Sequence, residues 1–290
     1  MSRWKAELAL GFNAVIWGAT FVLVKGALNQ ITPMLFLVLR FSVATVALAV
    51  LFRGRWRGRA SRVTPKMVAS GVMLGLFLFA GYLLQTLGLQ STSAPKSAFL
   101  TGLCTVMIPL MAALVYKIRP GIWEVAGVLA ATLGMGLMTI EGPIGSINRG
   151  DLLTFGAAIA FAAHVVATSH FAATVRFEVL SIFQVGAAAL SALCLVRWVE
   201  TPRVQWQPLA IWAILITGLL CTALAFTIQA WAQRYTTSTR TALIYALEPV
   251  VAWITSYSIT GVGLSGQAAA GAALILTGVL VVETKPFQPR

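Results

Sequence analysis

The chain has 290 residues, of which 59% are apolar and only 10% are charged. Soluble domains carry about 25% charged residues, so this composition excludes water as the main solvent of the chain. A helix needs about 20 apolar residues to cross a bilayer core about 30 Å thick, which leaves room for roughly ten crossings joined by short loops. The net charge of +13 indicates membrane topology rather than a nucleic-acid partner, because the basic residues gather at the ends of the apolar runs.

Apolar runs bounded by Gly, Pro or charged residues predict the helices in chain order. The first run lacks a small-residue cleavage motif and contains Trp17 and Lys25, so we interpret it as a helix and not as a removable signal peptide. The expected helices span residues 7–27, 34–52, 67–89, 94–116, 122–141, 151–171, 178–197, 208–233, 238–260 and 266–283. The expected fold class is therefore an all-α integral membrane protein with ten transmembrane helices.

The distribution of Lys and Arg predicts the orientation, since loops rich in these residues stay on the cytoplasmic side. The loop after the second helix holds Arg53, Arg55, Arg57, Arg59, Arg62 and Lys66. Placing this loop in the cytoplasm brings most other loop cations, and both termini, to the same side. We therefore expect cytoplasmic N- and C-termini in a bacterial inner membrane.

A shift of 144 residues aligns the chain with itself. The aligned pairs are Trp17 with Phe161, Arg40 with Gln184, Gln85 with Gln229, Lys96 with Arg240, Gly127 with Gly271 and Gly134 with Gly278. Each half has five expected helices, an odd number, so the second half must be inverted. We expect two repeats, residues 7–141 and 150–283, with a substrate site near the midplane between them. Pro109 and Pro249 depart from this register by four residues, which predicts a short insertion in the fourth helix.

Glu248 is the carboxyl group that we expect deepest in the membrane. It lies about 16 Å along the expected ninth helix. Thr241 and Tyr245 share its helical face, and Pro249 frees a backbone carbonyl beside them. A charge in the bilayer costs at least about 2.5 kcal/mol, so each one requires a reason. Two interpretations stay open: a group that titrates protons or contacts a substrate ammonium, and a structural carboxyl that is paired with Arg40 or capped by hydroxyls to hold the halves together.

Lys96 and Arg240 begin the fourth and ninth expected helices at matching repeat positions. They either attract an anion or a substrate carboxylate, helped by the positive ends of their helices, or extend to the membrane interfaces. Arg40 lies several residues inside the second helix. We interpret it, together with its repeat mate Gln184, as structural.

Other polar and aromatic residues fall on helix faces that we expect to line the interior. His164 is either a second titrating group or a histidine packed against a hydroxyl. Gln85 and Gln229 either line the pathway or join helices, as buried amides often do. The full set of expected pathway residues is Trp17, Tyr82, Gln85, Lys96, Phe99, Thr101, His164, Gln229, Arg240, Tyr245 and Glu248.

A resemblance to a known family rests on several short motifs. They are Trp17-Gly18 with Lys25, Arg40, residues 92–103, Gly150-Asp151 and Leu247-Glu248-Pro249. With these motifs the chain resembles the EamA-type members of the drug/metabolite transporter superfamily, and most of all the YddG-type amino-acid exporters. The resemblance covers nearly the whole chain. It implies two inverted repeats and the export of amino acids, aromatic and other, or of similar metabolites.

We therefore expect a secondary transporter or facilitator that exports amino acids by alternating access, with the first, third, fourth, sixth, eighth and ninth helices around a central cavity. The alternative is a proton-coupled exporter of cationic drugs. An enzyme is not expected, since no Ser/His/Asp set or P-loop is present and Cys104, Cys194 and Cys221 lack metal-site spacing. The expected partners are a small-molecule substrate, the lipid bilayer and, if transport is coupled, protons. No cofactor, metal or nucleic acid is expected, and monomer and dimer both stay open.

Overall fold

The structure is a computed structural model that describes residues 3–56, 63–92, 94–117, 120–139, 148–260 and 265–283. The described residues form helices and no β-strand, with an isolated bridge between Ile31 and Val204. Within this part of the chain, 7 helical segments are long and apolar enough to cross a membrane, and two shorter apolar helices lie at 122–137 and 266–282. The expected all-helical membrane fold is confirmed, while the number of crossings stays a prediction.

The helices fall within or close to the expected ranges. Their bounds are α1 Arg3–Ala27, α2 Pro33–Phe52, η1 Arg53–Trp56, α3 Pro65–Ser91, α4 Ala94–Gly102, α5 Cys104–Tyr116, α6 Ile122–Thr139, α7 Arg149–Ala172, α8 Phe177–Val199, α9 Pro208–Gly218, η3 Leu219–Leu224, α10 Ala225–Ala232, α11 Ser238–Tyr245, α12 Glu248–Thr260 and α13 Gly266–Glu283. Local sequence explains several helix starts. Pro33, Pro65 and Pro208 stand at first positions, where proline loses no helical hydrogen bond. Asn148 and Asp151 form a capping box at the start of α7.

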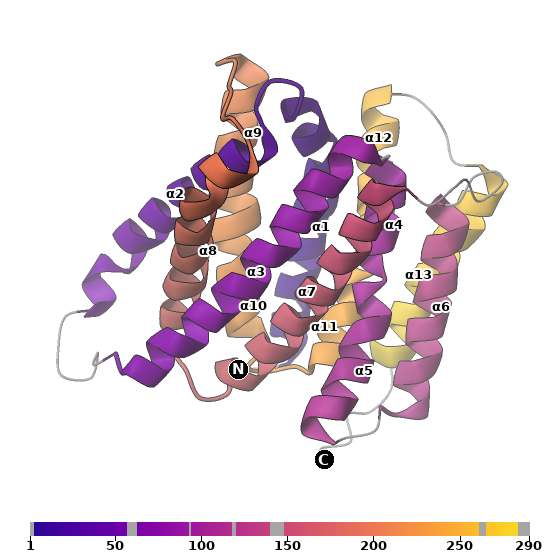
Figure 1. Ribbon diagram of the computed structural model, residues 1–290. Helices are drawn as coiled ribbons and strands as arrows, with labels where there is room; N and C mark the ends of the chain where they lie inside the picture. Colours follow the sequence, from indigo (N-terminus) through magenta and orange to yellow (C-terminus); the bar gives the residue numbers. More distant parts are fainter. Residues whose placement is uncertain are drawn as a thin grey trace.

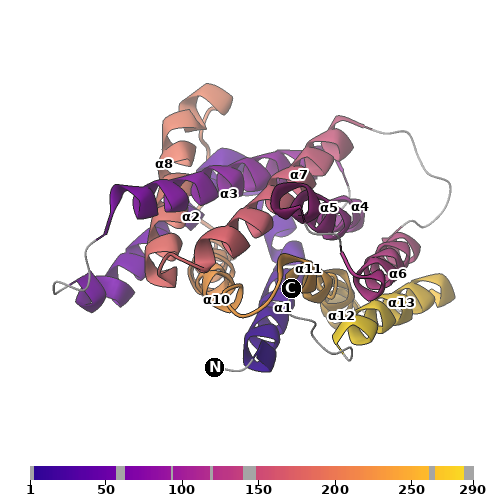
Figure 2. The same cartoon turned by 90° about the horizontal axis from the view of Figure 1, so that it is seen from below.

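The two edges of the bundle are formed by helices at matching repeat positions. α2 packs with α8 at one edge, and α6 packs with α13 at the other (Figures 1 and 2). A Cβ atom on Gly127 would lie 2.8 Å from the carbonyl oxygen of Gly278, and one on Gly134 would lie 2.5 Å from that of Gly271. Each glycine therefore contacts the repeat mate of the other, which is the pattern that a two-fold axis produces.

The fourth and ninth expected helices are interrupted at matching residues. α4 and α5 meet at Leu103, and α12 begins directly after Leu247, which lies 144 residues later. Both α5 and α12 contain 13 residues, so the insertion expected from Pro109 and Pro249 is wrong. The two prolines simply lie at different depths in equally long helices. Pro249 stands in the first turn, where proline is tolerated, and Pro109 stands inside α5.

The start of α1 and the end of α13 lie on the same face of the bundle, the lower one in Figure 1. Arg240 at the start of α11 joins them: it forms a 3.6 Å ion pair with Glu7 and donates a 3.1 Å hydrogen bond to the carbonyl oxygen of Val282. Cytoplasmic termini stay a prediction, and the basic residues Arg57, Arg59, Arg62, Arg119, Lys285 and Arg290 lie outside the described residues.

Candidate substrate cavity

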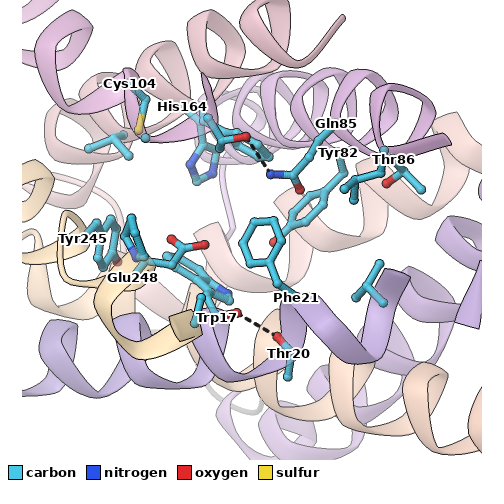
Figure 3. A pocket seen from close by; sticks show the side chains of 18 of the residues that line it. Trp17, Thr20, Phe21, Tyr82, Gln85, Thr86, Cys104, His164, Tyr245 and Glu248 are labelled. Carbon is cyan, nitrogen blue, oxygen red and sulfur yellow. Dashed lines mark hydrogen bonds between the residues drawn. The ribbon is translucent and has the colours of Figure 1, made fainter. Parts of the chain in front are cut away.

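A cavity of about 110 Å³ lies inside the bundle, between the two halves of the chain (Figure 3). Five helices of the first half line it, α1 to α5, together with α7, α10, α11 and α12 of the second half. A single water molecule needs about 10–15 Å³ of such space, so the cavity can hold several waters or a small solute.

Eight of the expected pathway residues line this cavity. They are Trp17, Tyr82, Gln85, Thr101, His164, Gln229, Tyr245 and Glu248. Their shared location is a property of the structure, and their role in transport stays a prediction. Thr86 and Phe226 also line the cavity and were missed, although their spacing of four and three residues from Tyr82 and Gln229 places each on an already identified helical face.

Three expected pathway residues do not join this group in the described structure. Arg240 is buried against Glu7 and Val282 at the start of α11, because α1 and α13 close over it there. Phe99 packs into the apolar cluster between α4, α6, α11 and α13. The side chain of Lys96 lies outside the described part of the chain.

Glu248 is the first residue of α12, and its carboxylate points into the cavity (Figure 3). The helix interruption before it places the side chain beside the positive end of α12, which favours a negative charge there. Among the described residues, no hydrogen bond or ion pair to this carboxylate is found. The cavity therefore holds a carboxylate that is available to a ligand.

Arg40 also lines the cavity, although the sequence indicated a structural role. Its Nε atom donates a 2.8 Å hydrogen bond to the hydroxyl of Thr222, and its Nη2 atom donates a 3.0 Å hydrogen bond to the hydroxyl of Tyr82. The ion pair between Arg40 and Glu248 that we considered from the sequence is not formed. Arg40 thus combines a fixed position with access to the cavity.

A π-helical segment, η3, provides the acceptor for Arg40. Residues Leu219–Leu224 form this wider turn between α9 and α10, and the Thr222 hydroxyl donates to the carbonyl oxygen of Thr217, five residues earlier. Trp17 Nε1 donates a 2.9 Å hydrogen bond to the carbonyl oxygen of Cys221 in the same segment. Single π-turns inside α-helices are frequent at functional sites. The sequence contained no signal that we could use to find this one.

Polar side chains around the cavity are held by short hydrogen bonds. His164 Nε2 lies 2.8 Å from Gln184 Oε1, and because an amide oxygen only accepts, the histidine donates. Gln85 Nε2 donates to the Thr101 hydroxyl at 3.1 Å. Gln184 contacts His164 from outside the cavity, and the structural role that we expected for it stays a prediction.

Aromatic rings form most of the apolar wall. The Trp17 ring lies 4.9 Å from Tyr245 and 5.4 Å from Phe226, and the Tyr82 ring lies 5.2 Å from Phe161, measured between ring centroids. Tilted and edge-to-face contacts of this kind are favourable for aromatic pairs. They leave flat apolar surfaces around the two charged groups.

The cavity is closed toward the face that carries the start of α1. Ala6, Leu10 and Ala14 are fully buried there, packed with Ala232 and Ile244. The α1 residues beside the cavity are only half-buried as far as Val24, near the other end of the helix. The structure is therefore sealed on one side of the cavity.

Comparison with known proteins agrees with this architecture. Residues 4–140 and 148–284 each match the EamA-like transporter family. A protein of Archaeoglobus fulgidus named Uncharacterized transporter is 32% identical over 98% of this chain and 88% of its own length. The Bacillus subtilis protein Uncharacterized transporter YoaV is 22% identical over 96% of both chains. A solved crystal structure has the same fold, with a TM-score of 0.77, 22% identity and 96% coverage of both chains. The chain belongs to the EamA-like transporter family of the drug/metabolite transporter superfamily, and it is an integral membrane transporter built from two EamA repeats.

Proposed function

We propose that this protein exports amino acids, aromatic ones included, and similar small metabolites across a bacterial inner membrane. The observation that carries the proposal is the carboxylate of Glu248, which has no partner among the described side chains and points into a cavity between the two repeats. A substrate ammonium group would supply the missing counter-charge, since a carboxylate away from water requires a partner. The aromatic wall would receive an apolar side chain.

The aromatic wall of the cavity also predicts that the protein accepts a broad range of substrates. Apolar surfaces discriminate weakly, because one methylene in such a pocket changes binding by only about 1–3 kcal/mol. Export of drug cations is the less favoured alternative, because the guanidinium of Arg40 shares the cavity and repels a second positive charge.

Alternating access is the expected mechanism. Inverted repeats place a site between two halves that rock against each other, so that the site opens to one side at a time. The Glu7 carboxylate is buried, accepts a 3.0 Å hydrogen bond from the Thr236 hydroxyl and pairs with Arg240. These contacts join α1 to α11 on the closed side, and they must separate for the cavity to open there.

Uptake into proteoliposomes tests the proposal. Radiolabelled neutral amino acids would be offered with and without an imposed pH gradient to the native protein, to Glu248→Gln and to a control, Glu124→Gln. The control removes a carboxylate that caps the backbone N–H of Gly121 beside α6, away from the cavity. We expect saturable uptake by the native and control proteins and its loss in Glu248→Gln.

The pH gradient separates two roles of Glu248. Uptake that ignores the gradient makes the protein a facilitator with Glu248 as a binding group. Uptake that is driven by the gradient only while Glu248 is present makes this residue the proton site. The absence of amino-acid flux, together with flux of a lipophilic drug cation, would replace the proposal with the drug-export alternative.

A further inference from the structure

Arg40 is a buried cation without a carboxylate partner in the described structure. The residue is only 4% exposed, and its two hydrogen bonds go to the neutral hydroxyls of Thr222 and Tyr82. Removing one charge from water without an opposite charge is costly. The site therefore lacks a negative charge that would complete it.

The two hydrogen bonds also set how the guanidinium can bind a ligand. Arginine has five N–H donors in a plane, and Thr222 and Tyr82 occupy one on Nε and one on Nη2. The group also lies over the Tyr82 ring, 4.2 Å from its centroid. Nη1 makes no hydrogen bond with a described residue, so donors remain for a flat, two-oxygen acceptor.

Glu248 determines which acceptor fits. Arg40 and Glu248 both line the cavity, so the two charges face a common space. The Glu248 carboxylate repels a ligand that carries only negative charge, such as phosphate. A zwitterion satisfies both charges at once, with its carboxylate on arginine and its ammonium on glutamate.

We propose that Arg40 binds the carboxylate of a zwitterionic α-amino acid whose ammonium group contacts Glu248. This assignment rests on the proposed function and refines it. It transfers to Arg40 the carboxylate-binding role that the sequence indicated for Lys96 or Arg240. Thr222 and Tyr82 are positioning residues, since they hold the guanidinium and leave its remaining donors to the substrate.

Three probes with one phenyl ring separate the two charged contacts. L-Phenylalanine has both charged groups, 3-phenylpropionate has only the carboxylate, and 2-phenylethylamine has only the ammonium. Isothermal titration calorimetry would measure each probe with the purified native protein, Arg40→Gln and Glu248→Gln. Glutamine is the residue at the matching repeat position, Gln184, which makes it a conservative choice for Arg40.

We expect Arg40→Gln to lose roughly 10- to 100-fold in affinity for L-phenylalanine and 3-phenylpropionate, the range for a charged hydrogen bond. It should bind 2-phenylethylamine at least as tightly as the native protein does, because a repelling positive charge is removed. Glu248→Gln should show the opposite selectivity. Retained or tighter binding of 2-phenylethylamine also reports that the Arg40→Gln protein is folded. If that variant does not fold, Arg40→Lys keeps the charge and loses the planar donors, and the same selective loss is expected in smaller measure.

Equal losses for all three probes, or no loss, would overturn the role of Arg40 while leaving amino-acid export intact. Arg40-dependent binding of 3-phenylpropionate without uptake of L-phenylalanine would overturn the proposed function and retain the carboxylate site. If the native protein binds none of the probes, both proposals fall.

Discussion

Gly18 of α1 lies against the backbone carbonyl of Glu248 at the start of α12. A Cβ atom on Gly18 would come within 2.6 Å of this carbonyl oxygen and within 2.8 Å of the Val251 Cβ atom. Because the nearest atom is backbone, it cannot turn aside as a flexible side chain could. The close approach of α1 therefore determines where the Glu248 carboxylate enters the cavity.

We expect Gly18→Ala to displace the start of α12 and to lower amino-acid uptake in proteoliposomes more than it lowers the amount of folded protein. Overpacking of this kind costs about 1–3 kcal/mol, which should also lower the thermal unfolding midpoint in detergent. Gly11→Ala is the matched control, since a Cβ atom on Gly11 of the same helix meets nothing within 4 Å. Equal uptake by Gly18→Ala and Gly11→Ala would contradict the inference that packing at Gly18 positions Glu248 for transport.

Glu7→Gln should weaken the closed side of the cavity. The substitution removes the charge that pairs with Arg240 and accepts from Thr236, so the state open toward the start of α1 becomes more populated. Cys104 lines the cavity and reports this opening. In a background with Cys194→Ala and Cys221→Ser, an impermeant thiol reagent should label Cys104 from that side roughly fivefold faster or more, as a coupling free energy of about 1 kcal/mol implies.

Glu178→Gln is the control for this experiment. Glu178 is also buried and pairs with Arg55 and Arg176, but it lies at the start of α8 at an edge of the bundle. The Glu178→Gln substitution should leave the rate of Cys104 labelling unchanged. A similar acceleration in both variants would mean that the Glu7 contacts do not control access.

Thr222→Val should reduce binding of carboxylates through Arg40. The change keeps the shape of the side chain and removes the oxygen that accepts from Nε, so the guanidinium loses one of its two anchors. We expect a several-fold loss of affinity for 3-phenylpropionate. This loss is smaller than the about 1.5–3 kcal/mol that a charged hydrogen bond contributes, because the substrate contact itself remains. Thr222→Ser keeps the hydroxyl and should bind as the native protein does. A loss that is the same in Thr222→Ser would assign the effect to packing.

Gly134→Val should destabilise the contact between α6 and α13. Its Cβ atom would lie 2.5 Å from the carbonyl oxygen of Gly271 and 2.8 Å from the Ile275 side chain. We expect a lower unfolding midpoint in detergent, corresponding to a loss of about 1–3 kcal/mol or more. Gly136→Ala in the same helix is the control, because its Cβ atom would be 3.7 Å from Phe99, an ordinary contact. Equal unfolding midpoints for Gly134→Val and Gly136→Ala would show that close packing of α6 against α13 at Gly134 does not contribute to stability.

The sequence identified many residues of the cavity because its signals are local. Tyr82 and Gln85 lie on one face of α3, and the shift of 144 residues connects Gln85 with Gln229. Both glutamines line the cavity, one from each half. Face periodicity and internal repetition are carried by the chain itself, so they can be recognised before any packing is known.

Two locations could not be predicted from the sequence because they depend on neighbours from distant segments. Arg240 faces Glu7, 233 residues earlier in the chain, and is withdrawn from the cavity. Arg40 faces Thr222, 182 residues later, and is held beside the cavity. A charged residue inside a helix has the same local pattern in both situations, so the sequence could not separate them.

By itself, the sequence determined that the chain is an all-helical membrane protein with two related halves, because hydropathy, the length needed to cross a bilayer and the 144-residue repeat are properties of the chain. Only the tertiary structure decided which charges share the cavity. Arg40 and Glu248 both line it without pairing, and Arg240 is buried elsewhere. The reason is that η3 and the interruption before α12 change the direction of side chains within otherwise continuous apolar runs, and their consequences depend on the helices packed against them.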